Sequence, residues 1–439
     1  MTKVRLNNVD LAWLRLDKAT NPMSITVLVH FDGMVNYEAL IISVSEIVTR
    51  YRRFRQRIVQ PQGLFRRPYW EDDPTDRVED HFERLQLSHP ADQAALDDIV
   101  NHKLNTPLEY DHPLWRISLV EGYPTGSVMI ATIHHCIADG ISLLQVLLQM
   151  TRPVSIQSPI PATQEALEST TIPYQARSGF RAQARKPNIF DILAAITRIV
   201  FRPPDPPTIF KGQLSTTKKI VWAESIALAD LKKIAKSNRA TVNDALMAIS
   251  TGAIRQYMDL RKKVPGKNVR AFILVNMRGR ELNEDLGNKF GLVFLTLPIN
   301  HQQPLERLEA ISKGMNYLKA SAEYAATYLI LHILGMLPAW VEDLAAKLLD
   351  SKGTIVATNV PGPGEQLSMA EVPVTSIRAW VPQSGRIGIG FSFISYNGKM
   401  GVGLNTDVGV IPDPEVLLDL FIAEYHSMLA LVAEPQAAV

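Results

Sequence analysis

The sequence lacks several features that would place a protein in a class at once. It contains a single cysteine, which excludes an internal disulfide and suits a reducing compartment. It has no apolar run of about 18 residues, so we expect no helix that spans a membrane. Its first residues carry no apolar core like that of a secretory signal. The formal net charge is only +2 at pH 7, which gives no indication of nucleic-acid binding. We therefore expect a cytoplasmic protein.

The chain is long enough for more than one hydrophobic core. A length of 439 residues predicts two domains or two halves. Apolar residues make up 46% of the chain and charged residues 21%, as in ordinary globular proteins. Prolines gather between positions 153 and 207, and proline-rich connections are stiff and extended. The sequence therefore predicts an N-terminal half over 1–152, a proline-rich crossover linker over 153–215 and a C-terminal half over 216–439.

Strand-like and helix-like patterns alternate in both halves. The predicted strands lie at 25–31, 127–133, 219–222, 269–277, 291–299, 354–359, 387–395 and 399–405. The predicted helices lie at 37–51, 94–104, 229–237, 241–258 and 414–432, with a long helical region over 305–349. Mixed strands and helices in each half indicate an α/β sandwich.

The most informative stretch is His-His-Cys-Ile-Ala-Asp-Gly at 134–140. It follows an apolar strand and precedes a helical pattern. Successive side chains of a strand point to opposite faces, so His134 and His135 cannot face the same space. An imidazole is the side chain best suited to take a proton at physiological pH. Asp139 is close enough to support the turn and Gly140 keeps the approach open. The stretch therefore predicts a catalytic base.

The pattern His-His-x-x-x-Asp-Gly resembles the motif of the CoA-dependent acyltransferase superfamily, which includes chloramphenicol acetyltransferase and the condensation domains of peptide synthetases. Other segments resemble the bacterial wax ester synthase/diacylglycerol acyltransferase family, in that family's order. They are 10–14, Asn21-Pro22-Met23, Pro113-Leu114-Trp115-Arg116, 119–122, Asn243-Asp244, Gly287-Asn288, Asn359-Val360-Pro361-Gly362-Pro363 and Ser395-Tyr396-Asn397-Gly398. The resemblance covers nearly the whole chain. It implies two chloramphenicol-acetyltransferase-like halves around a central substrate tunnel.

The resemblance also assigns roles around the histidines. It implies that His135, as the second histidine, is the general base, and that His134 supports the site. It implies that Asp139 is structural and not the third member of a charge-relay triad. A buried carboxylate needs a cationic partner, and Arg278 is our candidate for an ion pair with Asp139.

Two further segments are candidates for positioning substrates. Asn243 and Asp244 match a pair in the family, although Asp244 would also complete a helix-capping box with Thr241. Asn359, Pro361 and Gly362 belong to a rigid turn, because proline fixes φ and glycine allows a close backbone approach. The resemblance favours a tunnel-lining element over a simple turn at a sheet edge.

Two other kinds of chemistry fit the central stretch less well. A metal site built on His134, His135 and Asp139 is disfavoured, because adjacent strand residues diverge and no further ligand cluster is evident. A thioester intermediate on Cys136 is conceivable. However, Cys136 follows His135 directly and would point away from it if the strand continued, so we expect a small buried residue.

Three segments are candidates for contact with the phosphates of CoA or with a membrane. The five arginines between 50 and 57 indicate a solvated helix end, or a phosphate-binding patch for CoA. The segment 328–340 predicts a buried amphipathic helix, or a surface helix that enters lipid. The segment 189–201 is a second candidate for membrane contact.

The resemblance implies an O-acyltransferase that moves a long-chain acyl group from acyl-CoA to diacylglycerol or a fatty alcohol, giving triacylglycerol or wax ester. No metal or prosthetic group is required. The apolar substrates imply contact with a membrane surface or lipid droplet, peripherally and from the cytoplasmic side. Two alternatives are a relative that acylates another hydroxyl or an amine, and a non-catalytic lipid- or acyl-carrier-binding module. The intact His135, Asp139 and Gly140 argue against the second.

Overall fold

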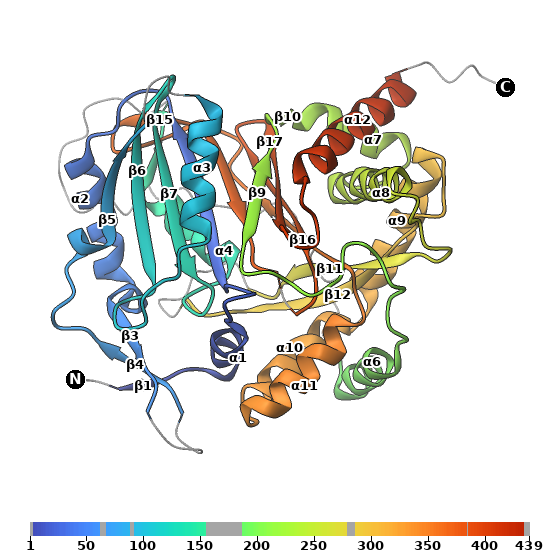
Figure 1. Cartoon of the computed structure of the whole chain (residues 1–439), viewed down its shortest axis with the longest axis horizontal. Coiled ribbons are helices and arrows are strands. Elements are labelled where there is room, and N and C mark those ends of the chain that lie inside the picture. The colour runs from blue at the N-terminus through green and yellow to red at the C-terminus, as the bar shows by residue number, and fades with distance from the viewer. Residues whose placement is uncertain are drawn as a thin grey trace.

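A computed structural model of the chain describes residues 3–61, 67–87, 92–154, 187–278, 286–383 and 385–433. Two seven-stranded sheets, each with its own helices, stand side by side (Figure 1). The two-halved α/β architecture predicted from the sequence is confirmed.

The N-terminal sheet carries the central motif at its middle. Its strand order is β5 (Phe82–Gln86), β6 (Trp115–Tyr123), β7 (Gly126–His134), β2 (Ser24–Phe31), β15 (Val372–Trp380), β14 (Leu367–Met369) and β8 (Thr151–Pro153). The helix α3 (Gln93–Leu104) packs on one face, in a cluster with Leu28 and Ile130. On the other face lie α2 (Tyr37–Arg50) and α4 (Gly140–Gln149), which pack near Ile25 and Val29. Buried apolar residues on both faces explain why β2 and β7 read as continuous apolar runs.

The C-terminal sheet also has seven strands. Its order is β10 (Ile226–Ala227), β17 (Lys399–Asp407), β16 (Ile389–Tyr396), β13 (Ile355–Pro361), β11 (Val269–Asn276) and β12 (Phe290–Leu297), and β9 (Lys218–Trp222) also pairs with β17. The helices α7 (Leu228–Ser237), α8 (Val242–Leu260), α9 (Pro304–Ala320) and α12 (Pro414–Ala433) cover it and share one large apolar core with its strands. The helix α8 is buried over most of its length.

Smaller elements complete the molecule. They are α1 (Asn8–Leu16), α6 (Ile189–Phe201), α10 (Glu323–Leu334), α11 (Ala339–Asp350), the 3-10 turns η1 (Arg52–Arg55) and η2 (Val78–His81), and a three-stranded sheet of β1 (Val4–Arg5), β4 (Tyr69–Asp72) and β3 (Gln56–Val59). The long helical region expected over 305–349 is therefore three helices, α9, α10 and α11. The breaks come at the Ser321 cap and at the Gly335–Pro338 turn, because proline cannot continue the hydrogen bonding of a helix.

The C-terminal part of the chain contributes two strands to the N-terminal sheet. Residues 367–380, from the C-terminal part of the chain, form β14 and β15 in the N-terminal sheet. There β15 runs antiparallel to β2, with Trp380 opposite Thr26 and Val374 opposite Phe31. The stretch 216–439 therefore contributes strands to both sheets and is not a separate half in space.

One helix among the described residues, α12, is long and apolar enough to cross a membrane by length and composition alone. A core helix of a soluble protein passes the same criterion. In this structure α12 packs on α8, and its Glu424 forms a buried ion pair with Arg307 of α9. This packing favours a core helix.

Candidate active site

The central motif lies where β7 gives way to α4. The strand ends at His134, and the helix begins at Gly140 with Asp139 as its N-cap. The Asp139 carboxylate accepts hydrogen bonds from the Ser142 backbone N–H at 2.9 Å and from the Ser142 hydroxyl at 3.0 Å. Such a cap satisfies a helix donor that would otherwise lack a partner. At the other end, the backbone N–H of His135 donates to the Met23 carbonyl at 2.7 Å. The short turn is therefore held at both ends.

The His135 side chain is buried and held in one orientation. Its Nδ1 lies 2.9 Å from Asn288 Oδ1. The Trp13 ring stacks on the imidazole with centroids 4.4 Å apart, and Phe290 lies 5.6 Å away. Burial lowers the pKa of His135 to about 4, although the charge of Asp139 opposes this shift. The imidazole is therefore neutral at physiological pH, as a general base must be.

The Asn288 amide selects the tautomer of His135. Its Nδ2 donates to the His135 carbonyl at 2.7 Å and to Asp10 Oδ1 at 2.8 Å, and its backbone N–H donates to the same Asp10 oxygen at 3.0 Å. With both Nδ2 donors engaged, Oδ1 must accept from His135 Nδ1–H. The proton therefore sits on Nδ1, and Nε2 keeps a free lone pair.

A buried ion pair supports this arrangement from behind. Arg53 Nη1 lies 2.6 Å from Asp10 Oδ2 and donates to the carbonyl of Ile137, in the motif itself, at 3.1 Å. Burial raises the pKa of the Asp10 carboxyl, against the opposing effects of Arg53 and Asn288. The roles of Asp10, Arg53 and Asn288 were not predicted from the sequence. The signals were present, since Asp10 and Asn288 lie in segments that resemble the family and Arg53 lies among the clustered arginines.

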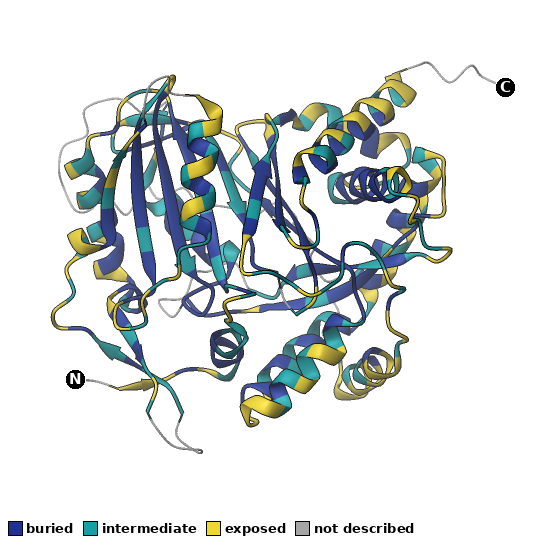
Figure 2. Ribbon diagram, viewed as in Figure 1, coloured by how far each residue is buried: buried dark blue, intermediate teal, exposed yellow. Residues whose placement is uncertain are grey.

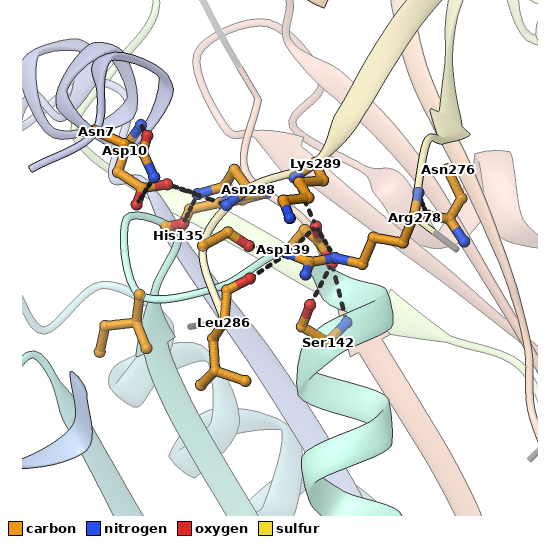
Figure 3. Close-up of polar contacts among 12 residues, drawn as sticks. Asn7, Asp10, His135, Asp139, Ser142, Asn276, Arg278, Leu286, Asn288 and Lys289 are labelled. Carbon is orange, nitrogen blue, oxygen red and sulfur yellow. Dashed lines mark hydrogen bonds and ion pairs between the residues drawn. The ribbon is translucent and has the colours of Figure 1, made fainter. Parts of the chain in front are cut away.

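The ion pair that the sequence predicts between Asp139 and Arg278 is present. Arg278 Nη2 lies 3.0 Å from Asp139 Oδ2, which also accepts from the Lys289 backbone N–H at 3.0 Å. Arg278 in turn donates to the carbonyls of Leu286 and Gly287 (Figure 3). Asp139 thus ties the start of α4 to the segment that carries Asn288.

His134 faces the opposite side of the sheet. Its Nδ1 accepts a hydrogen bond from the Cys136 backbone N–H at 3.1 Å, and its Nε2 lies 3.8 Å from Asp17 Oδ2. Burial alone would raise the pKa of the Asp17 carboxyl. The hydrogen bond and the charge of His134, and the hydrogen bond from Tyr110, outweigh burial and lower this pKa. His134 does not line the cavity described below. Because His134 and His135 lie on opposite faces of the sheet, they are not placed to bind one metal ion together.

Cys136 is fully buried in the N-terminal core. Burial, followed by the nearby charge of Asp10, raises the pKa of its thiol well above the usual value. A thiol that resists ionisation is a poor nucleophile.

An apolar cavity is lined by His135, by the N-terminal sheet and by the helices α2 and α4. The volume of this cavity is about 130 Å³, counted as the space that the centres of water molecules can occupy. The polar side chains on its wall are His135, Asp139, Asn276, Thr358, Asn359 and Ser392. Apolar residues of β2, β6, β7, α2, α4 and β15 form most of the rest. A Cβ on Gly140 would meet nothing within 4 Å, so the glycine borders open space.

The five predicted positioning residues do not all reach this cavity. Asn359 lies on its wall, and its Nδ2 donates weakly to Asn243 Oδ1 at 3.4 Å. Asp244 stands behind, in a capping box in which it accepts from the Thr241 N–H at 2.8 Å.

Pro361 and Gly362, the other two, are not on the wall. A Cβ on Gly362 would lie 2.1 Å from the Ser395 carbonyl oxygen, so this glycine allows two strands to approach closely.

The clustered arginines are largely engaged by other side chains. Arg50, Arg52, Arg53 and Arg57 contact Gln149, Asp72, Asp10 and Glu71, respectively. Arg50 and Arg55 are exposed, as in a solvated helix end, whereas Arg53 is buried behind the active site. Among the described residues, one trio could hold a metal ion, Asp73, Asp76 and His112, and it contains none of the motif residues.

His135 lies where the two α/β halves meet, beside an apolar cavity, in a fold of the two-halved condensation-domain type. In overall fold the chain is similar to the first condensation domain of the calcium-dependent antibiotic synthetase, with a TM-score of 0.65 at 15% identity over 100% of this chain and 98% of that one.

The family follows from the sequence over most of the chain. Residues 6–246 match the wax ester synthase/diacylglycerol acyltransferase catalytic domain, and residues 286–429 match the C-terminal domain of the same family. The chain belongs to the wax ester synthase/diacylglycerol acyltransferase family.

Individual relatives match over more than nine tenths of both chains. A probable diacylglycerol O-acyltransferase from Mycobacterium tuberculosis is 25% identical over 93% of this chain and 92% of its own. The O-acyltransferase WSD from Acinetobacter baylyi is 24% identical over 98% of both chains. The solved wax ester synthase/diacylglycerol acyltransferase from Marinobacter aquaeolei has a TM-score of 0.71 at 20% identity, over 98% of this chain and 100% of that one.

Proposed function

We propose that this protein transfers a long-chain acyl group from acyl-CoA to the hydroxyl of diacylglycerol or a fatty alcohol, giving triacylglycerol or wax ester. Family membership supports acyl transfer to an alcohol. The observation that carries the mechanism is the fixed tautomer of His135, whose Nδ1–H is bound by Asn288 at 2.9 Å beside an apolar cavity.

In the proposed reaction the acceptor hydroxyl gives its proton to His135 Nε2 as its oxygen attacks the thioester carbonyl. The tetrahedral intermediate then collapses, the C–S bond breaks, and the protonated His135 returns the proton to the CoA thiolate. General-base assistance typically contributes about 10²–10⁴-fold. Alignment of the two substrates and stabilisation of the oxyanion supply the remainder.

The residues around His135 have distinct proposed roles. His134, Asp139 and Arg278 hold the turn, and Gly140 leaves the approach open. Asn359 contacts substrate from the cavity wall.

Four residues support that wall without lining it. They are Asn243, Asp244, Pro361 and Gly362, through the contacts already described. Acyl-CoA enters as a substrate, and the proposed chemistry requires no metal ion or prosthetic group. A related starter condensation domain has been solved in complex with C8-CoA, which supports this substrate class.

The apolar acceptors imply that the protein works at a membrane surface or lipid droplet, on the cytoplasmic side and without spanning the bilayer. Diacylglycerol and long-chain alcohols partition into lipid, so the enzyme must take them from there.

A thiol-release assay tests this function. The purified chain is given palmitoyl-CoA with diacylglycerol, hexadecanol, a long-chain amine or no acceptor, and free CoA and lipid products are measured. We expect CoA release that depends on an alcohol and is lost in His135→Ala. Release with the amine alone would favour the other-acceptor alternative. Binding of palmitoyl-CoA with no release in any mixture would favour a non-catalytic module.

A further inference from the structure

The helix α11 presents its apolar side to solvent. Trp340, Leu344 and Leu348 follow one another at intervals of four residues, so they form a single stripe along the helix. All three are exposed, Trp340 by 71%. The acids Glu342 and Asp350 lie on the buried side. A surface helix of a water-soluble protein normally has the opposite polarity.

The helix α6 is apolar on two sides. Ala195 and Ile199 are fully buried against the helical layer below. Phe190, Leu193 and Phe201 point outward, and Phe201 is 81% exposed. One buried side would suffice to hold α6 in place, so the outward side indicates a second apolar partner.

The two helices belong to the same layer. Ile192 and Ile196 of α6, Ile330 of α10 and Leu349 of α11 pack in one cluster. Figure 1 shows α6 beside α10 and α11 along one edge of the molecule, and Figure 2 shows exposed residues on their outer sides. We call the outward residues the docking face. They are Phe190, Leu193, Phe201, Trp340, Leu344 and Leu348.

Among the described residues, α6 and α11 carry three exposed charges without an ion pair, two positive and one negative. Arg198 of α6 and Lys347 of α11 are exposed and form no ion pair among the described residues. The negative one is Asp191, which accepts from the backbone N–H of its own helix cap at 3.0 Å, whereas Asp343 pairs with Lys18 at 2.5 Å. Exposed aromatic and leucine side chains among lysine and arginine are typical of a surface that enters the headgroup region of an anionic bilayer.

We propose that the docking face binds an anionic phospholipid bilayer and places the active site beside it. This inference rests on the proposed function, because it supplies the route by which a lipid alcohol reaches the enzyme. The helix α1 contacts both α11 and the active site. Arg15 of α1 donates to the Leu337 carbonyl at 2.8 Å and pairs with Glu342 of α11 at 3.3 Å. The same helix α1 carries Trp13, which stacks on His135.

Vesicle sedimentation tests the proposal without any assay of activity. The wild type and the triple variant Trp340→Ser/Leu344→Ser/Leu348→Ser are mixed with vesicles of phosphatidylglycerol and phosphatidylcholine. We expect the triple variant to partition at least about tenfold less, because membrane affinity scales with buried apolar area. The matched control, Ile42→Ser/Leu260→Ser/Leu431→Ser, removes exposed apolar side chains from α2, α8 and α12 and should bind as the wild type does.

A second variant tests the charge. Lys347→Glu should weaken binding to the anionic vesicles by about fivefold or more and leave binding to pure phosphatidylcholine unchanged. Unchanged melting temperatures establish that the variants are folded. Equal vesicle binding by the two triple variants, or no binding by the wild type, would overturn the proposal. So would a wild-type dimer in solution that the first triple variant dissociates, since the face would then join two copies.

Activity separates this proposal from the proposed function. With a short-chain acyl-CoA and hexanol, both soluble in water, the Trp340 triple variant should match the wild type, whereas its rate on vesicle-borne diacylglycerol should fall. If the wild type transfers no acyl group to either acceptor, the proposed function is wrong, and the sedimentation result still decides whether the face binds lipid. Equal loss on soluble and vesicle-borne acceptors would mean that the face supports the fold rather than docking.

Discussion

The two sides of the end of β7 place the same residue type in contrasting surroundings. His135 faces the apolar cavity, stacked on Trp13 and bound through Nδ1 by Asn288. His134, its neighbour, faces the other side of the sheet toward Asp17 and is absent from the cavity wall. The pleat of the strand, rather than the residue type, makes one imidazole a base and the other a support. Each prediction below tests part of that difference.

The largest effect should come from the base itself. His135→Ala should lower acyl transfer at least about 10²-fold, because the acceptor hydroxyl loses its proton acceptor. His134→Ala is the matched control and should lose less than about tenfold, since it alters the support alone. Steady-state rates and circular dichroism of both variants provide the test. A larger loss at His134 would reverse the assignment of the two faces.

Breaking the ion pair beneath the turn should affect both stability and activity. Asp139→Asn keeps the size of the side chain but leaves the Arg278 guanidinium without its counter-charge, and both side chains are buried. We expect a loss of about 3–5 kcal/mol in the free energy of unfolding. Urea denaturation measures it, and Arg278→Gln should reproduce it. An inactive Asp139→Asn variant with unchanged stability would indicate instead that Asp139 acts directly in the reaction.

Removing the amide that orients the base should act on turnover. Asn288→Ala frees the His135 ring, so kcat should fall about 10–10²-fold while KM changes little. Asn288→Asp provides a second test. A carboxylate beside the imidazole should raise the pKa of His135 and move the acid limb of the pH profile to higher pH. A loss of stability with an unmoved acid limb in both variants would make Asn288 purely structural.

The pH profile of the wild type should reflect the lowered pKa of the buried His135. Because the pKa of His135 is lowered from 6.5 to about 4, kcat/KM should fall only as the pH approaches 4, where the base becomes protonated. The same shift affects stability. The unfolded chain binds this proton more readily, so the contribution of His135 is complete above 6.5 and is lost as the pH falls toward 4. A half-maximal rate near pH 6.5 would instead indicate that the base is a histidine exposed to water.

The smallest effect should come from the cysteine between the two faces. Cys136→Ser should keep substantial activity, because the thiol is buried and its raised pKa disfavours the thiolate. Initial-rate plots should intersect, as for a ternary complex. Parallel lines, together with an acyl group trapped on Cys136 before acceptor is added, would replace direct attack with a covalent route.

Local signals predicted the elements that hold the base. The apolar run before His134 and the helical spacing after Gly140 correspond to β7 and α4 in the structure. The capping of α8 by Thr241 and Asp244 was also visible, since it depends on residues three positions apart. Such features are decided within a few residues of chain.

Contacts between distant segments could not be read in the same way. The bond from Asn288 to His135 joins residues 153 positions apart. Arg53 reads as one of several surface arginines, yet it pairs with Asp10 behind the motif. The strand β15 was missed because Pro373 and Arg378 interrupt its apolar pattern and its partner β2 lies near the other end of the chain. Tertiary pairing decides these positions, and no local pattern records it.

The insertion of β15 has a consequence for synthesis on the ribosome. The strands β2, β6 and β7 can pair early, but the open edge of β2 meets its partner only when Val372–Trp380 leaves the exit tunnel. At about 5–20 residues per second, that apolar edge waits for tens of seconds. An unprotected edge strand invites pairing with other chains. Nascent or prematurely terminated chains that stop before 372 should therefore depend on chaperones to stay out of aggregates.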